Sequence, residues 1–194
     1  MRILYFSLLA FLWLFYLLYW WVKTRDVKET EQVHESVVSQ LIRFVSMISA
    51  GVLLIFQNIS LGVLDSQFIK SSTISCWIGV ALTAVGLLFS VWTRNYLGEN
   101  WSQAVMIKKD HQLITSGPYS IVRHPIYTGL LLAIIVSAIV IGEWRGIVAV
   151  LLVFGVLLYK LRVEEKWMRV KFGDAYELYA KRVAAFIPHF NKIG

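Results

Sequence analysis

The segment GPYSIVRHPIY at residues 117–127 gathers side chains that could bind and orient a polar ligand. The imidazole of His124 and the phenols of Tyr119 and Tyr127 can donate or accept hydrogen bonds. Pro125 suits the first turn of a helix, and the free N–H groups of a helix start can hold a carboxylate. A helix start would by itself explain His124 and Pro125. A helix start does not explain the other polar residues of this segment, and their presence beside His124 indicates a functional site.

A second set of charged side chains follows at residues 160–165, with the sequence KLRVEE. Lys160 and Glu164 lie four residues apart, so they can pair on one face of a helix. The plain alternative is a solvated helix end with charges of both signs. Residues 174–183 predict an amphipathic helix at the membrane surface, ending before Pro188.

Charge and cysteine content exclude several classes of site. The net charge of +7 could indicate nucleic acid, but the basic residues are scattered and accompany no nucleic-acid motif. Anionic lipid head groups explain the charge better, so we expect membrane lipids and no nucleic acid as partners. Cys76 is the only cysteine, so the chain can form no internal disulfide and no thiolate-based metal centre. No metal site is predicted.

The composition indicates an all-α, polytopic integral membrane protein. Hydrophobic residues make up 58% of the chain and charged residues 16%, with a mean hydropathy of +0.64, which is far too apolar for a soluble domain of this length. Five apolar runs could each form a transmembrane helix. They lie at residues 3–22, 41–64, 73–93, 125–141 and 145–161.

The last two runs have only a short turn between them, so we expect an antiparallel helical hairpin. Both are near the lower length limit for crossing a bilayer, which leaves room for a site at the interface. In the third run, Gly79 and Gly86 offer small surfaces that let membrane helices approach closely. Arg43, near the start of the second run, is able to snorkel to the interface.

The distribution of basic residues predicts the orientation in the membrane. With the C-terminus in the cytoplasm, all but three of the 19 Lys and Arg residues lie inside, the exceptions being Arg2, Lys70 and Arg145. The membrane would be a prokaryotic plasma membrane or the endoplasmic reticulum. We divide the chain into an N-terminal three-helix region at residues 1–93 and a catalytic region at residues 94–194, with the loop at 94–124 facing the tail at the cytoplasmic interface.

Five segments, taken in their order and spacing, resemble the isoprenylcysteine carboxyl methyltransferases and their prokaryotic relatives. This family shares a broader membrane superfamily with phospholipid methyltransferases and sterol reductases. The segments are LGENWS at 97–102, HQLITSGPY at 111–119, RHPIYTG at 123–129, EE at 164–165 and FGDAYELYAKRV at 172–183. The resemblance covers residues 96–188, about half of the chain.

The resemblance implies an enzyme that uses S-adenosylmethionine. The cofactor-binding residues that it carries over are His111, Gln112, Leu113, Ile114, Tyr119, His124, Pro125, Ile126, Tyr127 and Glu164. The family also places two arginines near the methyl acceptor. Arg182 matches one of them, whereas Lys160 occupies the position of the other and Arg162 lies two residues later, so either could hold the substrate.

The function expected is methylation of a carboxylate on a lipophilic, isoprenylcysteine-like substrate at the cytoplasmic interface. An ionised carboxylate needs no general base, so Arg182 with Arg162 or Lys160 would clamp it. The alternative is an amine acceptor such as a phospholipid head group, which must lose a proton to Tyr127, His124 or Glu165. An NADPH-dependent reductase is less favoured, because the longer set of spans of the sterol reductases is missing and hydride chemistry has no separate signature here. A further alternative is a non-enzymatic membrane scaffold, in which the loop motifs only cap helices.

Overall fold

The computed structural model describes residues 2–23, 30–33, 36–56, 59–70, 72–98, 106–108 and 113–188. Four of its helices are long and apolar enough to cross a membrane, and so the chain is a membrane protein. These helices are α1 (Arg2–Lys23), α2 (Val37–Ile55), α3 (Thr73–Leu97) and α5 (Trp144–Phe172). A shorter apolar helix of 17 residues, α4 (Pro125–Ile141), completes the bundle.

The ends of these helices follow local signals. The side chains of Ser36 and Ser72 cap α2 and α3 by accepting hydrogen bonds from the backbone N–H groups three residues on. Gly142 ends α4 in the left-handed conformation, with φ of 72°. The predicted second span at 41–64 was wrong at both ends, because α2 begins at Val37 and its C-cap, Phe56, leaves the helical conformation.

Smaller elements connect the long helices. Two 3-10 helices, η1 (Gly62–Asp65) and η3 (Gly117–Ser120), precede α3 and α4, and helix α6 (Asp174–Arg182) follows α5. The strands β1 (Thr30–Val33) and β2 (Met106–Lys108) pair in an antiparallel sheet. The described residues are otherwise helical or connecting segments, and the sheet joins β1, which lies between α1 and α2 in the chain, to β2, which lies between α3 and α4.

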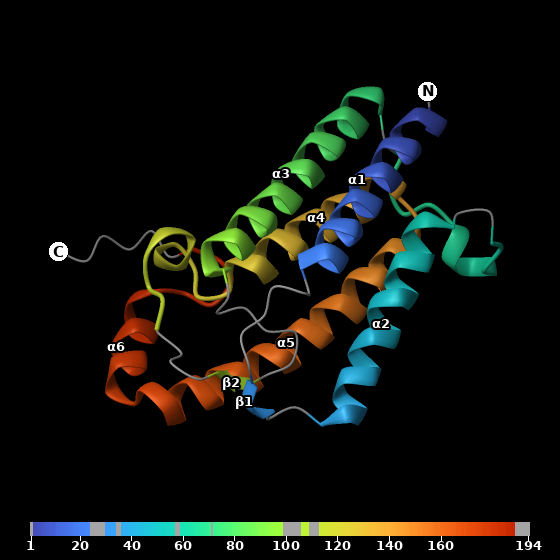
Figure 1. Cartoon of the computed structure of the whole chain (residues 1–194). Coiled ribbons are helices and arrows are strands. Elements are labelled where there is room, and N and C mark those ends of the chain that lie inside the picture. The colour runs from blue at the N-terminus through green and yellow to red at the C-terminus, as the bar shows by residue number, and fades with distance from the viewer. Residues whose placement is uncertain are drawn as a thin grey trace.

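Figure 1 shows α1, α3 and α4 side by side, with α5 and α2 forming a second pair beneath them. The closest approach is between α3 and α4, at Gly86 and Gly129. A Cβ added to Gly86 would lie 2.6 Å from the Gly129 carbonyl oxygen, and one added to Gly129 would lie 2.5 Å from the Gly86 oxygen. The small residue predicted at Gly86 therefore does let two apolar helices approach closely.

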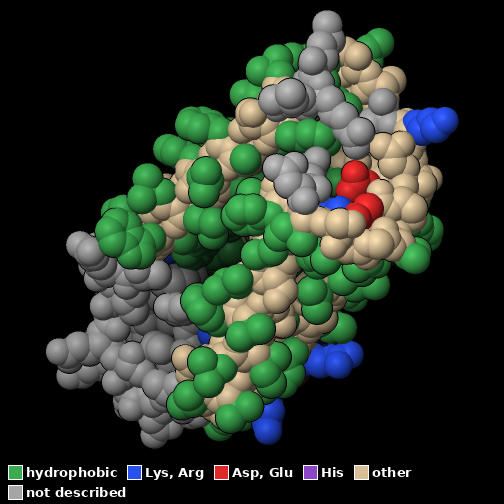
Figure 2. All heavy atoms as spheres, turned by 90° about the vertical axis from the view of Figure 1, so that its right-hand side faces the viewer, with side chains coloured by type: hydrophobic (Ala, Val, Ile, Leu, Met, Phe, Trp, Pro, Cys, Tyr) green, Lys and Arg blue, Asp and Glu red, His purple; other side chains and the backbone are tan. Residues whose placement is uncertain are grey.

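A buried apolar cluster joins α4, α5 and α2 through residues such as Leu54, Ile134, Val153 and Leu157. Hydrophobic side chains also cover most of the face in Figure 2, as expected for helices surrounded by lipid. The surfaces buried between the helices and those exposed around the bundle are thus both mainly apolar, and the ion pairs gather at the two ends of the bundle.

At the end of the bundle that holds the α4–α5 turn, Arg145 is 1% exposed and ties three segments together. It donates to the carbonyl oxygens of Phe56 and Ile59, at 3.3 and 3.2 Å, and it pairs with Asp65 and Glu143. At the opposite end, the start of α4, the second half of α5 and α6 come together (Figure 1). The predicted site residues that the structure describes lie there.

Candidate active site

The start of α4 is joined to the segment that follows α6. The backbone N–H of Arg123 donates to the carbonyl oxygen of Ala184 at 2.8 Å, and that of His124 donates to Ala185 at 3.1 Å. One turn into α4, the Thr128 hydroxyl donates to the carbonyl oxygen of Phe186 at 2.9 Å. These bonds hold residues 184–186 against α4, next to the two consecutive glutamates of α5.

Glu164 lies at the centre of the first group of contacts. Its Oε1 accepts a 2.6 Å hydrogen bond from the Tyr127 hydroxyl and lies 3.4 Å from Lys160 Nζ. Its Oε2 lies 3.5 Å from His124 Nδ1. The side chain of Glu164 is 25% exposed whereas that of Lys160 is only 8% exposed, so the carboxylate keeps an open side. The predicted pairing of Lys160 with Glu164 is confirmed.

Glu165 lies in a different and more closed group. Its Oε1 accepts from Arg123 Nε at 2.9 Å and from Arg123 Nη2 at 2.6 Å, and its Oε2 accepts from Arg169 at 3.2 Å. Arg123 also donates to the carbonyl oxygens of Ala180 and Val183. Through Arg123, then, Glu165 fixes the end of α6 against α4, and its oxygens are occupied by cations.

His124 stands between the two carboxylates, with Nδ1 facing Glu164 and Nε2 lying 3.3 Å from Glu165. Its ring stacks on that of Tyr127 with centroids 5.4 Å apart. Burial alone would lower the pKa of His124, but the hydrogen bonds and negative charges of Glu164 and Glu165 outweigh it and raise that pKa above 6.5. The imidazole therefore gains charge more readily than it would in water.

Two tyrosines close the group on the side of η3. The Tyr179 hydroxyl donates to the carbonyl oxygen of Tyr119 at 2.7 Å, which links α6 to η3. Burial raises the pKa of the Tyr119 phenol, and the charge of Glu164 raises it further. Burial likewise raises the pKa of Tyr179 to about 12. Both phenols are neutral at physiological pH, so they can donate hydrogen bonds but are poorly suited to accept a proton as bases.

The structure thus brings together Tyr127, His124, Lys160, Glu164 and Glu165, with Tyr119 beside them. Pro125 and Ile126 are buried at the start of α4, and Leu113 and Ile114 are half-buried before η3. His111 and Gln112 lie outside the described residues.

Two of the predicted substrate-binding residues stand apart from this group. Arg162 is exposed on α5, two positions from Lys160 and therefore on another face of the helix. Arg182 is exposed at the end of α6, where its Nε lies 3.3 Å from the carbonyl oxygen of Leu178. Of the three predicted substrate-binding residues, Lys160, Arg162 and Arg182, Lys160 is the one that contacts Glu164.

Two further cations belong to the site although the sequence did not single them out. Arg123 was noted only as a neighbour of His124, and its position in the RHP segment was the one available signal. Arg43 was interpreted as a snorkelling residue, yet it is half-buried on α2 and lies within electrostatic reach of Tyr127. Only the packing of α2 beside α4 and α5 reveals it. Among the described residues no group of His, Cys, Asp or Glu is arranged to hold a metal ion.

The fold and this site define a membrane protein with a cluster of polar and charged side chains at one end of an apolar helix bundle. A profile of the phospholipid methyltransferase family matches residues 74–175, which include nearly all of α3, the whole of α4 and α5, and both glutamates. The chain belongs to this family.

Individual relatives agree with that assignment. Protein-S-isoprenylcysteine O-methyltransferase from Schizosaccharomyces pombe is 35% identical over 98 residues, covering 47% of this chain and 40% of the relative. Isoform B of that enzyme from Arabidopsis thaliana is 28% identical, covering 48% and 49%. The cobalt-zinc-cadmium resistance protein CzcN from Cupriavidus metallidurans is 34% identical, covering 59% and 48%. The matches to these three thus span about half or less of each relative's length.

Proposed function

We propose that this chain is a membrane methyltransferase that moves a methyl group from S-adenosylmethionine to a carboxylate on a lipophilic, isoprenylcysteine-like acceptor. The observation that carries the proposal is the contact of Glu164 with Tyr127 and Lys160, next to the buried apolar cluster between α2, α4 and α5. Family membership and the names of two relatives support the same chemistry.

The donor set fits the proposed cofactor. Glu164 is a partly open carboxylate that can accept from an ammonium or a ribose hydroxyl, and Tyr119 and Tyr127 provide neutral phenols beside it. When bound, S-adenosylmethionine supplies an electrophilic methyl group on a sulfonium cation. Together with His124, Pro125 and Ile126, the half-buried Leu113 and Ile114 would form the wall of this binding site, joined by His111 and Gln112 from outside the described residues.

We assign Lys160 to the acceptor carboxylate, because it is nearly buried and lies beside Glu164. Arg43 adds positive charge from α2 on the same side. An ionised carboxylate needs no general base, so these residues have only to hold it in line with the methyl group and exclude water. Arg182 and Arg162 are exposed, and we propose for them a contact with the acceptor as it approaches from the membrane surface.

Glu165 has a positioning role in this proposal. Its oxygens are held by Arg123 and Arg169, so it is poorly placed to take a proton from an amine acceptor. An amine acceptor such as a phosphatidylethanolamine head group is nevertheless the second candidate, because the matching family is named for phospholipid methylation. His124 would then be the base, and its raised pKa favours it as a proton acceptor.

For the membrane arrangement we propose five spans with α4 as the short one, the C-terminus in the cytoplasm and α6 on the cytoplasmic surface. The alternating direction of α1 to α5 supports this, since the start of α4 and the second half of α5 then share one side with most basic residues. Residues 94–194 would form the catalytic region, to which α2 of the N-terminal region contributes Arg43.

Ligand-induced stabilisation of the purified protein tests the function. A ligand that binds the native state raises the melting temperature, so S-adenosylhomocysteine should raise it and NADPH should not. Labelled S-adenosylmethionine is then offered with S-farnesylcysteine or with phosphatidylethanolamine, and label should appear in the former. Lys160→Ala should abolish transfer while the exposed Lys166→Ala on the same helix retains it. Stabilisation by NADPH alone, or no transfer to either acceptor, would overturn the proposal.

A further inference from the structure

At the end of the bundle opposite the candidate site, the apolar sequence of α2 continues after the helix has ended. Helix α2 ends at Ile55, but the sequence carries no charged residue at positions 44–64, and the chain then forms η1. We call Phe56 together with residues 59–70 the η1 loop. A loop in water is usually built from polar residues, so the apolar sequence of this one needs another explanation.

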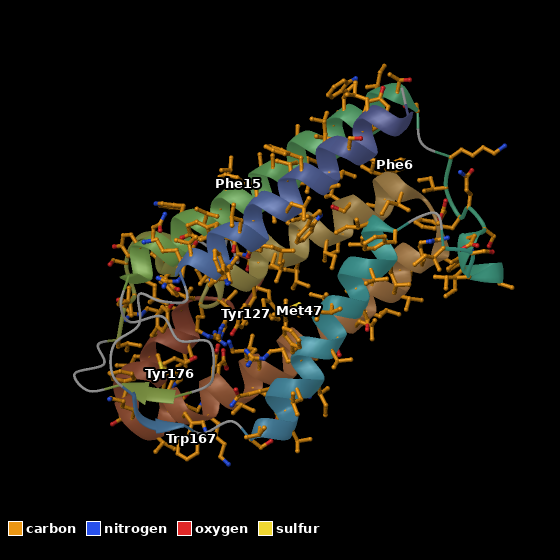
Figure 3. The ribbon with its side chains drawn as sticks, turned by 45° about the vertical axis from the view of Figure 1, so that its right-hand side comes forward. Phe6, Phe15, Met47, Tyr127, Trp167 and Tyr176 are labelled. Carbon is orange, nitrogen blue, oxygen red and sulfur yellow. The ribbon has the colours of Figure 1, made fainter. Side chains whose placement is uncertain are left out.

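Large apolar side chains of the η1 loop are exposed. Val63 is 82% exposed, and Phe56, Ile59 and Ile69 are about half exposed. Figures 1 and 3 both show η1 beside the end of α2, at the edge of the bundle, whereas Met47 of α2 packs toward the other helices. The η1 loop thus continues the exposed apolar surface of α2. An apolar patch of this kind marks a surface that meets something other than water.

Arg145 gives the carbonyl oxygens of the η1 loop their hydrogen bonds, although it lies far from the candidate site. Its side chain donates to the carbonyl oxygens of Phe56 at 3.3 Å and Ile59 at 3.2 Å. The same guanidinium is 1% exposed and pairs with Asp65 and Glu143. In an aqueous loop, water would satisfy these carbonyl oxygens without the cost of burying an arginine. A buried guanidinium here therefore suits a loop that is kept away from water.

Side chains within the η1 loop complete this arrangement. Asp65 accepts a 2.8 Å hydrogen bond from the backbone N–H of Leu61, and the Ser66 hydroxyl donates to the carbonyl oxygen of Val63 at 2.6 Å. Beyond Ser66, backbone hydrogen bonds fix the loop to the α4–α5 turn. Non-helical backbone is tolerated at membrane depth where the protein itself pairs its polar groups. The η1 loop has that arrangement, with bonded backbone groups inside and apolar side chains outside.

The lengths of the helices leave room for the η1 loop within a bilayer. The 19 residues of α2 and the 17 of α4 span about 28 and 25 Å at 1.5 Å per residue, less than a hydrocarbon core of about 30 Å. The 25 residues of α3 span about 37 Å and pass beyond these ends (Figure 1). Trp144 is exposed beside the loop, and indole rings gather where hydrocarbon meets head groups.

We propose that the η1 loop is embedded in the lipid of the leaflet away from the candidate site, with Val63 below the head groups and Arg145 as the internal partner of the loop backbone. A second copy of this chain is the rival occupant of the exposed face. Lipid is favoured because the face is continuous with the exposed apolar surface of α2 and its backbone groups are already bonded within the chain. The inference does not depend on methyl transfer.

Fluorescence quenching tests this placement in the full-length protein, reconstituted in phosphatidylcholine vesicles. Cys76→Ala removes the single thiol, and Val63→Cys is then labelled with a nitrobenzoxadiazole fluorophore. We expect a nitroxide on the lipid acyl chain to quench the label strongly. Aqueous iodide should quench it several-fold less than a label at Lys70→Cys, an exposed charged position of the same loop that serves as the matched control. Equal iodide quenching at the two positions overturns the inference.

A label at Leu151→Cys, on a side chain of α5 that is 63% exposed, gives the reference for contact with lipid. Nitroxide quenching at Val63 that approaches this reference supports the inference. A label at Val63 that neither iodide nor the nitroxide reaches would mean that protein covers the loop. That result would favour a second copy of the chain and overturn the assignment to lipid.

Photolabelling of the unmodified protein keeps the test decisive if the Cys76→Ala background folds poorly. A phosphatidylcholine with a diazirine on its acyl chain is activated around the wild-type protein, and the labelled residues are mapped by mass spectrometry. Labels on Phe56, Ile59 and Val63 support the inference. Labels on outward helix residues such as Leu151, with none in the η1 loop, overturn it.

The role of Arg145 has its own readout. In Arg145→Gln the carbonyl oxygens of Phe56 and Ile59 lose their buried donor, so the loop should move toward water. We expect iodide quenching of the Val63 label to rise several-fold, while the Leu151 label keeps its value. Unchanged quenching at Val63 would overturn the assignment of Arg145 as the partner of the loop backbone.

Discussion

Tyr127 donates a 2.6 Å hydrogen bond to Glu164, and this contact joins the first turn of α4 to a position 37 residues later on α5. Both ends of the bond are fixed by further contacts, since Tyr127 stacks on His124 and Glu164 lies beside Lys160. The phenol thus holds the carboxylate at a set position while leaving one side of it open for a ligand.

The phenylalanine variant tests that relationship first. Tyr127→Phe keeps the stacked ring but removes a hydrogen bond to a charged group, a contact worth about 1.5–3 kcal/mol. We expect the affinity for S-adenosylhomocysteine, measured by calorimetry, to fall by about tenfold or more. Tyr159→Phe, on the exposed side of α5, loses only a contact with Ser39 and should bind as wild type does. Equal affinities in both variants would show that Glu164 needs no help from Tyr127.

A second prediction concerns stability at the Arg123–Glu165 pair, whose side chains are 12% and 8% exposed. Removing Arg123 leaves the nearly buried Glu165 carboxylate with Arg169 and His124 as its remaining partners. Arg123→Met should therefore lower the free energy of unfolding, by up to the roughly 3–5 kcal/mol that a buried pair loses with one partner. Denaturation in mild detergent measures it. Arg169→Met removes a second cation from Glu165, but its side chain is 42% exposed, and an exposed pair contributes about 1 kcal/mol or less.

The double variant Arg123→Met with Glu165→Leu tests whether these two side chains stabilise the protein as a pair. If the two side chains act as a pair, the double variant should lose less than the sum of the single variants. Additive losses would instead mean that Arg123 acts mainly through the carbonyl oxygens of Ala180 and Val183.

How far the fold could be predicted depends on what ends each helix. The run at residues 125–141 was predicted and α4 is Pro125–Ile141, because Pro125 begins it and Gly142 ends it. The last apolar run was predicted as a membrane span at residues 145–161, and α5 begins at Trp144 and continues beyond that run to Phe172. The end of an apolar run marks where a helix leaves the apolar region, but the helix itself can continue beyond that point. The segment KLRVEEKWMR consists largely of residues with high helix propensity, so it stays helical in water. The strands β1 and β2 are too short for the alternation of apolar and polar residues that would predict a strand.

The contacts of the candidate site likewise divide into those that the sequence could predict and those that only the fold reveals. The contact of Lys160 with Glu164 follows from a spacing of four residues and could be predicted. The contact of Arg123 with Glu165 spans 42 residues, and the electrostatic influence of Arg43 on Tyr127 depends on how α2 packs. No local pattern encodes such long-range contacts. Our proposal of Lys160 rather than Arg162 for the acceptor likewise rests on the contact of Lys160 with Glu164 in the folded chain.

A third prediction follows from the raised pKa of His124. A group whose pKa is higher in the folded state stabilises the fold fully below its unfolded pKa, and this contribution is lost as the pH rises through the folded value. The melting temperature of wild type should therefore exceed that of His124→Gln most clearly in mildly acidic buffer. The difference should shrink as the pH rises above 6.5 and through the raised pKa. A difference that grows with pH would mean that the neutral imidazole is the stabilising form.

The last prediction tests the helix contact that places the start of α4. A Cβ at Gly86 would lie 2.6 Å from the Gly129 carbonyl oxygen, and backbone cannot give way as a flexible side chain can. Gly86→Ala should therefore force α3 and α4 apart and lower the free energy of unfolding by about 1–3 kcal/mol. Gly155→Ala on α5 meets nothing within 4 Å and should be neutral or stabilising, since alanine favours a helix. Because α4 carries Tyr127, Gly86→Ala should also weaken S-adenosylhomocysteine binding, whereas Gly155→Ala should not. Wild-type stability and affinity in Gly86→Ala would show that the α3–α4 contact tolerates an added methyl group and that the site does not depend on it.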